Sequence, residues 1–403
     1  MKMKKTISFI LAVILVLSLC ACGNTASSSD AASEPASEAA SAEPVSPAEE
    51  PAAEEETVLS IKDVFAAHGL KFGSCLSPAM IQVGTYEEIL TSQFSSITLE
   101  NYMKPEYILD QKKSIETGDV VVKFDSTTTE LLDWAQKNNM AVRGHTLVWH
   151  DQTPEWLFHV DFDESKDYAD RDTMLARLES YIKQVFDILE EKGYSDMFYA
   201  YDVVNEAWME TGSLRKTNWY NTIGKDYLRY AFYYADKYAP DNIKLFYNDY
   251  NENLKVAPLL KFVKTLVDDE GNSLIDGIGL QAHLYMSEDI DKYLSSIDVL
   301  AKTGLILEIT ELDICLGSFD NPVKNAADDD YKAQGRVYYN LINGLLERVD
   351  AGTLNMDSLT VWGFTDGLSW RKESKPCIYS DMLEPKYAYY GIAQMKDQAG
   401  FDD

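Results

Sequence analysis

The sequence predicts an α/β fold, a single (β/α)8 TIM barrel that follows a signal region and a disordered linker. Eight short apolar segments alternate with amphipathic segments after residue 57, which is the pattern of a parallel barrel. The length of 403 residues suits one large barrel with extensions. Polar side chains also gather where most of the apolar segments end, and active sites of such barrels lie at the C-terminal ends of the strands.

The charge of the chain limits the partners that it can bind. It has 36 basic and 66 acidic residues, for a net charge of −30. A nucleic-acid-binding surface needs a basic footprint, so we expect no nucleic-acid partner. The acidic surface suits a soluble protein outside the cell and a neutral polysaccharide, whereas an acidic polymer would be repelled.

Residues 1–22 have the pattern of a bacterial lipoprotein signal. Lysines at positions 2, 4 and 5 precede an apolar segment at 7–19 that is short for a membrane span. Leu19 then stands three residues before Cys22, and the small residue Ala21 lies directly before the cysteine. We therefore expect lipidation of Cys22 and anchoring at the extracellular face of a bacterial membrane. Cleavage of an ordinary secretion signal, giving a secreted protein, is the alternative.

Residues 23–57 are rich in Ala, Ser, Glu and Pro and contain no Lys or Arg. Such a segment buries too little apolar surface to offset its chain entropy, so it is expected to be disordered. Its prolines and like charges keep it extended. We interpret it as a stalk, with a spacer needed only for export as the alternative. Residues 58–399 then form one globular domain without an internal repeat or a second domain.

The expected strands are short runs rich in β-branched, aromatic and other apolar residues, typical of strands buried on both faces. In chain order they are KFGSC at 71–75, SSITLE at 95–100, AVRGHTLVW at 141–149, FYAYDVVN at 198–205, IKLFYN at 243–248, GIGLQA at 277–282, LILEIT at 305–310 and LTVWGFT at 359–365. Between most pairs, apolar residues recur at helical spacing. The expected helices span 61–67, 129–138, 174–192, 227–237, 256–267 and 331–349.

The fourth and seventh apolar runs are each followed by a carboxylate that matters for the chemistry. The fourth run ends in Asn205 and Glu206, and the seventh has Glu308 inside it and Glu311 just after it. An unpartnered carboxylate in the core is costly, so we expect Glu206 where its strand leaves the core. Capping of the next helix by Asn205 and Glu206 is the alternative interpretation. Two carboxylates that face one cleft are what retaining glycoside hydrolysis requires, because one protonates the leaving oxygen and the other attacks the anomeric carbon.

Six motifs carry a resemblance to a known family. They are TLENYMKPE at 98–106, GHTLVWH at 144–150, DVVNEAW at 202–208, LQAHL at 280–284, ITELDI at 309–314 and VWGFTDGLSW at 361–370. With these motifs the chain from about residue 66 to 395 resembles glycoside hydrolase family 10, the endo-β-1,4-xylanases. Ala207 follows Glu206 as it does in that family, whereas the wider clan has a proline there, which argues against a cellulase or mannanase.

The resemblance implies the roles of the two carboxylates. Glu206 would be the acid/base and Glu311 the nucleophile of a retaining double displacement that hydrolyses internal β-1,4-xylosidic bonds of xylan. The amide of Asn205 would bind the sugar 2-hydroxyl. His283 would hydrogen-bond Glu311, and Asp313 would orient His283, so that Glu311 stays ionised while Glu206 keeps its proton.

The resemblance also implies a set of substrate-binding residues at the strand ends. Three of them would bind sugar hydroxyls in the second subsite on the glycone side, namely Glu100, Asn101 and Lys104. Others would surround the sugar at the cleavage point, namely His145, Trp149 and Gln281. Trp362 and Trp370 would offer flat faces for pyranose rings, with core packing as the alternative for each. The expected partners are xylan and xylo-oligosaccharides, and the expected state is a monomer.

We expect no cofactor and no metal. His150 has no Cys or carboxylate at ligand spacing nearby, and the acidic runs at 268–270 and 328–330 lack the spacing of a calcium loop. After the signal region, Cys75, Cys315 and Cys377 remain, an odd number that cannot form a closed disulfide framework. Free buried thiols are the default, although Cys75 and Cys377 come from strands that adjoin in a closed barrel.

Other functions are compatible with parts of the sequence. A signal, a stalk and a globular body also describe a two-lobed solute-binding lipoprotein, which would not need paired carboxylates on the fourth and seventh strands. A sugar-binding barrel without catalysis is a third reading, and the presence of both carboxylates counts against it. Two departures from the family, Tyr387 in place of the usual proline and the segment 317–330, affect the expected leaving-side subsites but not the reaction.

Overall fold

Eight parallel strands form a closed barrel within residues 60–318, 321–323 and 325–401, the residues that this computed structural model describes. The barrel strands are β1 (Lys71–Leu76), β2 (Ser96–Leu99), β3 (Ala141–Val148), β4 (Phe198–Asn205), β5 (Lys244–Asp249), β6 (Gly277–Leu280), β8 (Ile306–Cys315) and β11 (Ser358–Val361). Each pairs in parallel with the next, and β11 pairs with both β8 and β1, which closes the barrel. All eight expected strands are therefore confirmed, and the two-lobed alternative is wrong for the described residues.

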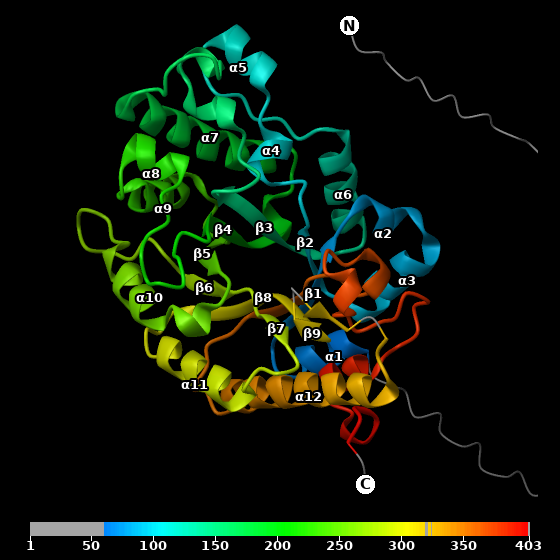
Figure 1. The fold of residues 1–403 in the computed structure, drawn as a ribbon. Coiled ribbons are helices and arrows are strands. Elements are labelled where there is room, and N and C mark those ends of the chain that lie inside the picture. The colour runs from blue at the N-terminus through cyan, green and yellow to red at the C-terminus, as the bar shows by residue number, and fades with distance from the viewer. Residues whose placement is uncertain (1–59, 319–320, 324, 402–403) are drawn as a thin grey trace, which may run out of the picture. The chain divides into compact units, whose positions relative to one another are not determined.

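The helices lie around the barrel and connect successive strands (Figure 1). Their bounds are α1 (Ile61–Ala66), α2 (Pro78–Gln82), α3 (Gly84–Gln93), α4 (Pro105–Ile108), α5 (Gln111–Thr117), α6 (Ser126–Lys137), α7 (Arg171–Glu191), α8 (Asn218–Ile223), α9 (Tyr227–Tyr238), α10 (Val256–Phe262), α11 (Ile290–Ala301), α12 (Asp328–Asp350) and α13 (Tyr387–Ile392). The six expected helices are present with shifted ends. The other helices were not predicted, including α11, which Asp289 caps by accepting a hydrogen bond from the Lys292 backbone N–H at 3.1 Å.

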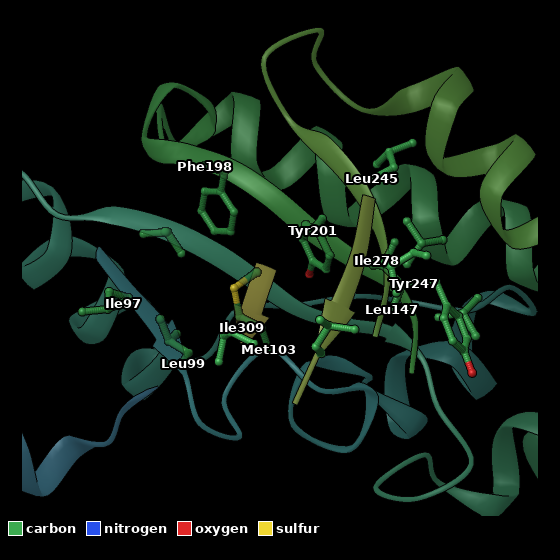
Figure 2. Close-up of a cluster of buried hydrophobic side chains, with 14 of the residues drawn as sticks. Ile97, Leu99, Met103, Leu147, Phe198, Tyr201, Leu245, Tyr247, Ile278 and Ile309 are labelled. Atoms are coloured by element: carbon green, nitrogen blue, oxygen red, sulfur yellow. The ribbon is translucent and has the colours of Figure 1, made fainter. Parts of the chain in front are cut away.

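Every barrel strand contributes buried apolar side chains to the core, because both faces of a parallel sheet are covered. Figure 2 shows buried side chains from neighbouring strands, including Phe198 and Tyr201 of β4, Ile278 of β6 and Ile309 of β8. Each of these four side chains is at most 1% exposed. Glycines make room for the larger rings: a Cβ at Gly144 of β3 would lie 2.3 Å from the ring of Tyr201.

A charged layer crosses the barrel interior below the polar strand ends. Arg143 of β3 is 1% exposed and places Nη2 2.5 Å from Asp202 Oδ1 on β4, while its Nη1 donates to Glu308 of β8. Burial raises the pKa of Glu308 to about 7, although the charge of Arg143 opposes this. Arg143 is thus the partner that allows Glu308 to lie inside an apolar run. Glu308 does not belong to the cleft described below.

The strand β8 is longer than expected. The sequence predicted an end at 310, but a short parallel strand, β7 (His283–Tyr285), pairs with β8 beyond the end of β6. This pairing aligns His283 with Asp313 and extends β8 to Cys315. A two-stranded hairpin of β9 (Gly317–Ser318) and β10 (Asn321–Pro322) follows.

The expected signal region and linker, including Cys22, lie outside the described residues. Among the helices between residues 60 and 401, none has both the length and the apolar character that crossing a membrane requires. The lysine-poor linker and the anchor therefore stay predictions from the sequence.

Candidate active site

A cavity of about 580 Å³ lies at the C-terminal ends of the barrel strands. Every residue that the sequence analysis expected in the cleft lines it: Glu100, Asn101, Lys104, His145, Trp149, Asn205, Glu206, Gln281, His283, Glu311, Trp362 and Trp370. Asp313 lies behind His283 instead of in the wall. The polar ends of six strands or their following loops thus meet in one concave site, as the (β/α)8 topology requires.

Glu206 follows β4 and enters the cavity with neutral hydrogen-bond donors around it. Trp149 donates Nε1–H to Oε2 at 2.9 Å, and Gln281 donates from Nε2 to Oε1 at 3.0 Å. The backbone of Glu206 has a φ of 55°, in the left-handed region that non-glycine residues rarely adopt. His150 lies farther away, with Nδ1 3.9 Å from Oε2. Helix capping by Glu206 is therefore wrong: its carboxylate faces the cavity.

Glu311 lies on β8 with 7% of its side chain exposed and has a different set of neighbours. His283 Nε2 is 3.2 Å from Oε2, and Asn248 donates from Nδ2 to Oε1 at 2.9 Å. Burial alone would raise the pKa of Glu311. The hydrogen bond from His283 and the surrounding positive charges outweigh burial and lower the pKa below its ordinary value. The environment of Glu311 therefore favours the carboxylate anion.

His283 connects Glu311 to a second buried carboxylate. Its Nδ1 lies 3.0 Å from Asp313 Oδ2, as the sequence analysis expected. Burial lowers the pKa of His283, but Asp313 and Glu311 outweigh burial and raise it to about 10. Asp313 is held in turn by Arg371 Nη1 at 2.7 Å and by Trp370 Nε1 at 3.0 Å. The imidazolium between two carboxylates is thus fixed in position and charge.

A chain of amides spans the space between the two glutamates. Gln281 Nε2 lies 3.0 Å from Glu206 Oε1 and 3.2 Å from Asn205 Oδ1. Asn248 Nδ2 lies 2.9 Å from Asn205 Oδ1 and 2.9 Å from Glu311 Oε1. Asn205 therefore lies between the two carboxylates and contacts both Gln281 and Asn248.

Lys104 lines the cavity beside Trp149, with its Nζ 4.9 Å from the centroid of the Trp149 ring. It is 5% exposed, and its Nζ donates to Asn101 Oδ1 at 2.9 Å and to Gln152 Oε1 at 2.7 Å. Burial lowers the pKa of Lys104, while the carboxylates of Glu311 and Glu100 oppose this shift. Although Lys104 precedes α4, it is not a solvated residue at a helix start.

The two tryptophans differ in exposure. Trp362 is 7% exposed and packs edge-on to His145 with ring centroids 5.6 Å apart, so both cavity lining and core packing apply to it. Trp370 is 54% exposed and presents a free indole surface at the rim of the cavity. A flat apolar surface of this kind suits the apolar face of a pyranose ring.

Several cavity residues were not singled out from the sequence: Asp151, Gln152, Tyr250, Asn251, Tyr285 and Arg371. Each lies within a few positions of a polar residue at a strand end, and that adjacency is the signal that would have found them. Within the described residues, no group of three or more His, Cys, Asp or Glu is arranged to hold a metal ion. Cys75, Cys315 and Cys377 are buried free thiols there.

Comparison with known proteins agrees with this geometry. The sequence model described as Glycosyl hydrolase family 10 matches residues 60–395. The chain is 36% identical over 337 residues to endo-1,4-beta-xylanase B of Butyrivibrio fibrisolvens, covering 80% of this chain and 51% of that protein. It is 38% identical over 316 residues to a putative endo-1,4-beta-xylanase of Caldicellulosiruptor saccharolyticus, covering 74% of this chain and 97% of that protein. The chain thus spans about half the length of the first relative and nearly all of the second.

Solved structures share the fold at similar identity. An endo-1,4-beta-xylanase from Caldicellulosiruptor owensensis superposes with a TM-score of 0.72 at 34% identity, covering 83% of this chain and 99% of that chain. A mutant of the intracellular xylanase of Thermoanaerobacterium saccharolyticum, in complex with xylotetraose, gives a TM-score of 0.73 at 31% identity, with 83% and 98% covered.

Proposed function

The chain belongs to glycosyl hydrolase family 10, and from that premise we propose that it is an endo-1,4-β-xylanase that hydrolyses internal bonds of xylan with retention of configuration. The observation that carries this proposal is the pair Glu206 and Glu311, which face one cavity with different neighbours. Retaining glycosidases need such a pair in two different protonation states. Relatives named as endo-1,4-beta-xylanases support the choice of substrate.

In the first step Glu311 acts as the nucleophile. Its carboxylate attacks the anomeric carbon and forms a glycosyl-enzyme ester, while the glycosidic C–O bond breaks. Glu206 transfers its proton to the departing oxygen, which leaves as the 4-hydroxyl of the shortened chain. The positive charge of His283 beside Glu311 keeps the nucleophile ionised before the attack.

In the second step Glu206 acts as a base. It takes a proton from water, whose oxygen attacks the anomeric carbon and displaces Glu311 as a carboxylate. Glu206 is then protonated again and the sugar leaves with its original configuration. Trp149 and Gln281, the neutral donors on the two oxygens of Glu206, hold the carboxyl group in place through both steps.

The polar residues around Lys104 suit a glycone-side subsite. Lys104, Asn101 and Gln152 bond one another in the structure and present donors and acceptors to the cavity. A sugar hydroxyl binds such a group by exchanging one of these bonds for its own. Xylose lacks the C6 hydroxymethyl group of glucose, so close walls on this side favour xylan by steric exclusion.

Product analysis on four polysaccharides tests this function. Glucuronoxylan and arabinoxylan should yield short xylo-oligosaccharides, while carboxymethylcellulose and mannan should yield little reducing sugar. NMR of the first products from xylotetraose should show the β-anomer before mutarotation. Activity on carboxymethylcellulose equal to that on xylan would overturn the choice of substrate. Binding of xylo-oligosaccharides without any product would support the non-catalytic barrel instead.

The same proposal includes a location. The lipoprotein-like pattern at Leu19–Cys22 and the linker at 23–57 support lipid anchoring of the enzyme at Cys22 on the extracellular face of a bacterial membrane. The proposal takes the enzyme to be a monomer. Two chemical facts support this arrangement: the chain is strongly acidic, and its proposed substrate is an external polymer.

A further inference from the structure

The backbone at Glu206 is strained and therefore has to be held by its surroundings. The left-handed region is unfavourable for a non-glycine residue, and Glu206 has a φ of 55°. Three contacts hold the two peptide units around it. Glu206 donates its N–H to Asn248 O at 2.9 Å, Arg215 donates Nε–H to Glu206 O at 3.1 Å, and Ala207 donates its N–H to Tyr247 Oη at 3.0 Å.

The contact from Ala207 leads to a buried ionic pair. Tyr247 Oη lies 2.5 Å from Asp249 Oδ2, and Lys255 donates from Nζ to Asp249 Oδ1 at 2.7 Å. Tyr247, Asp249 and Lys255 are all fully buried, and none of them lines the cavity. Figure 2 shows Tyr247 among the buried side chains of the barrel. Burying a Lys–Asp pair costs desolvation and contributes little net stability, so its presence calls for another reason.

The charge of the pair sets the direction of the hydrogen bonds. An ionised carboxylate only accepts, so Asp249 paired with Lys255 obliges the Tyr247 hydroxyl to donate its proton to Oδ2. The phenol oxygen then faces Ala207 as an acceptor, which is what the peptide N–H needs. An amide or an absent side chain at position 249 would no longer oblige the Tyr247 hydroxyl to donate in that direction, because an amide can also donate, and the Ala207 N–H would lose its fixed acceptor.

A second branch returns to the cavity wall. Arg215, which holds Glu206 O, donates Nη2–H to Tyr250 Oη at 3.1 Å. Lys255 Nζ lies 3.9 Å from the centroid of the Tyr250 ring. Tyr250 lines the cavity, so the two branches join Glu206 to one aromatic residue of the wall.

We propose that Tyr247, Asp249 and Lys255 are positioning residues that hold the Glu206–Ala207 peptide, so that the Glu206 carboxyl group points at the leaving oxygen. The inference rests on the proposed function, because it assigns Glu206 the role of proton donor. We call the three residues the Tyr247 relay. The relay touches no substrate and acts only through the backbone next to Glu206.

Tyr247→Phe is the sharpest test because it removes a single oxygen atom. Two aryl xylobiosides with the same glycone separate positioning from general structural damage. A phenyl leaving group needs protonation, and kcat/KM for phenyl xylobioside should fall by about 100-fold, in line with the loss from a misplaced general acid. A dinitrophenyl leaving group needs little protonation, so its kcat/KM should change less than about 3-fold, because general acid catalysis contributes little to that step.

Lys255→Met and Asp249→Asn test the charged part of the relay with the same two substrates. A matched control exists at the same end of the barrel, where Lys386 Nζ lies 3.0 Å from Asp366 Oδ2 in another buried Lys–Asp pair. In Lys386→Met the ratio of kcat/KM for phenyl xylobioside to kcat/KM for dinitrophenyl xylobioside should stay that of the parent, even if the midpoint temperature of thermal unfolding falls. Lys255→Met should lower kcat/KM for phenyl xylobioside much more than kcat/KM for dinitrophenyl xylobioside.

Equal losses on both leaving groups in Tyr247→Phe and Lys255→Met would overturn the proposal and leave the relay a merely structural feature. Failure of the proposed function would give a different result. In that case the parent enzyme itself would release neither phenol nor dinitrophenol from the two substrates. A crystal structure of Tyr247→Phe tests the relay independently of activity. It should show the Glu206–Ala207 peptide displaced, and an unmoved peptide would contradict the inference.

Discussion

Glu206 and Glu311 carry the same functional group, and their neighbours make them chemically different. The donors on Glu206 are the neutral groups of Trp149 and Gln281. Glu311 faces His283, whose pKa is raised to about 10 and which therefore stays charged at neutral pH. An adjacent positive charge strongly favours ionisation of a carboxyl group, whereas a neutral hydrogen-bond donor favours ionisation much more weakly. This difference in charge supports the proposal that Glu311 is the nucleophile and that Glu206 transfers the protons.

Replacing each glutamate by Ala should cause different failures. Glu206→Ala should release an initial burst of phenol from dinitrophenyl xylobioside and then turn over slowly, because water lacks its general base. Glu311→Ala should lose activity on every substrate, since no glycosyl-enzyme forms. Added azide should rescue both variants, giving the β-azide with Glu206→Ala and the α-azide with Glu311→Ala. NMR of the azide products measures the anomeric configuration.

The parent enzyme is the control for this experiment, because azide should not change its products. If both variants gave the same anomer, or if the two anomers were exchanged, the roles assigned to Glu206 and Glu311 would be wrong. Loss of folding in either variant is checked by its far-ultraviolet circular dichroism.

A second prediction concerns His283. The imidazolium lowers the pKa of Glu311, and Glu311 must be ionised to attack. In His283→Asn the positive charge is lost, so the pKa of Glu311 rises. As the pH is lowered, Glu311 is then protonated, and activity declines, at a higher pH than in the parent. The acidic limb of kcat/KM for dinitrophenyl xylobioside should therefore move to higher pH. His68→Asn is a suitable control, because His68 pairs with Asp350 on the surface; a limb that stayed in place in His283→Asn would falsify the role of the imidazolium.

At the scale of elements, the strands were predictable and their lengths were not. Buried parallel strands are continuous apolar runs, so β4 at Phe198–Asn205 agrees with the sequence prediction residue for residue. The end of β8 was wrong because its extension depends on pairing with β7, a contact between distant segments that no local pattern encodes. Likewise the partner of Glu308 is Arg143, which is 165 positions away in the chain.

The expected site residues were found because they end strands, and the missed ones lie in the loops beyond. Gln152 and Asn251 both have a positive φ, at 42° and 47°, and both line the cavity. Such backbone turns decide whether a loop side chain enters the cleft or faces solvent. Composition and periodicity report neither the turn nor its direction, so adjacency to a polar strand end marks Tyr250 and Arg371 as candidates without showing that their side chains enter the cleft.

The packing of β3 against β4 gives a prediction for stability. A methyl group at Gly144 would lie 2.3 Å from the ring of Tyr201, which is fully buried and has no space to move. Gly144→Ala should therefore lower the free energy of unfolding by about 1–3 kcal/mol or more, the usual effect of overpacking a core. Gly84→Ala is the control, since a Cβ there meets nothing within 4 Å. Urea denaturation of both variants measures the difference, and equal midpoints would contradict this account of the interior.

At the scale of the whole molecule, residues 60–401 contain the complete cavity and the charged layer beneath it. Several buried cations of this domain pair with carboxylates, as Arg143 does with Asp202 and Lys255 with Asp249. The linker at 23–57, which has acidic residues and no Lys or Arg, contributes to the net charge of −30. Catalysis should need nothing from residues 1–57, whose proposed role is location.

That separation leads to the last prediction. In the native host, Cys22→Ser should remove the proposed lipid anchor and release active enzyme into the medium, whereas the parent should partition into the detergent phase with the membranes. The released enzyme should have the same kcat/KM on xylotetraose as the parent, because Cys22 is far in sequence from every residue of the cavity.

Cys20→Ser is the matched control and should stay anchored, since the bulky Leu19 directly before Cys20 fits the lipoprotein pattern poorly. A version of the chain that starts at Val58 should equal the released enzyme in rate. Were Cys22→Ser still to partition as the parent does, the anchor would lie at another residue, and a Val58 version without activity would mean that the leader contributes to the catalytic domain after all.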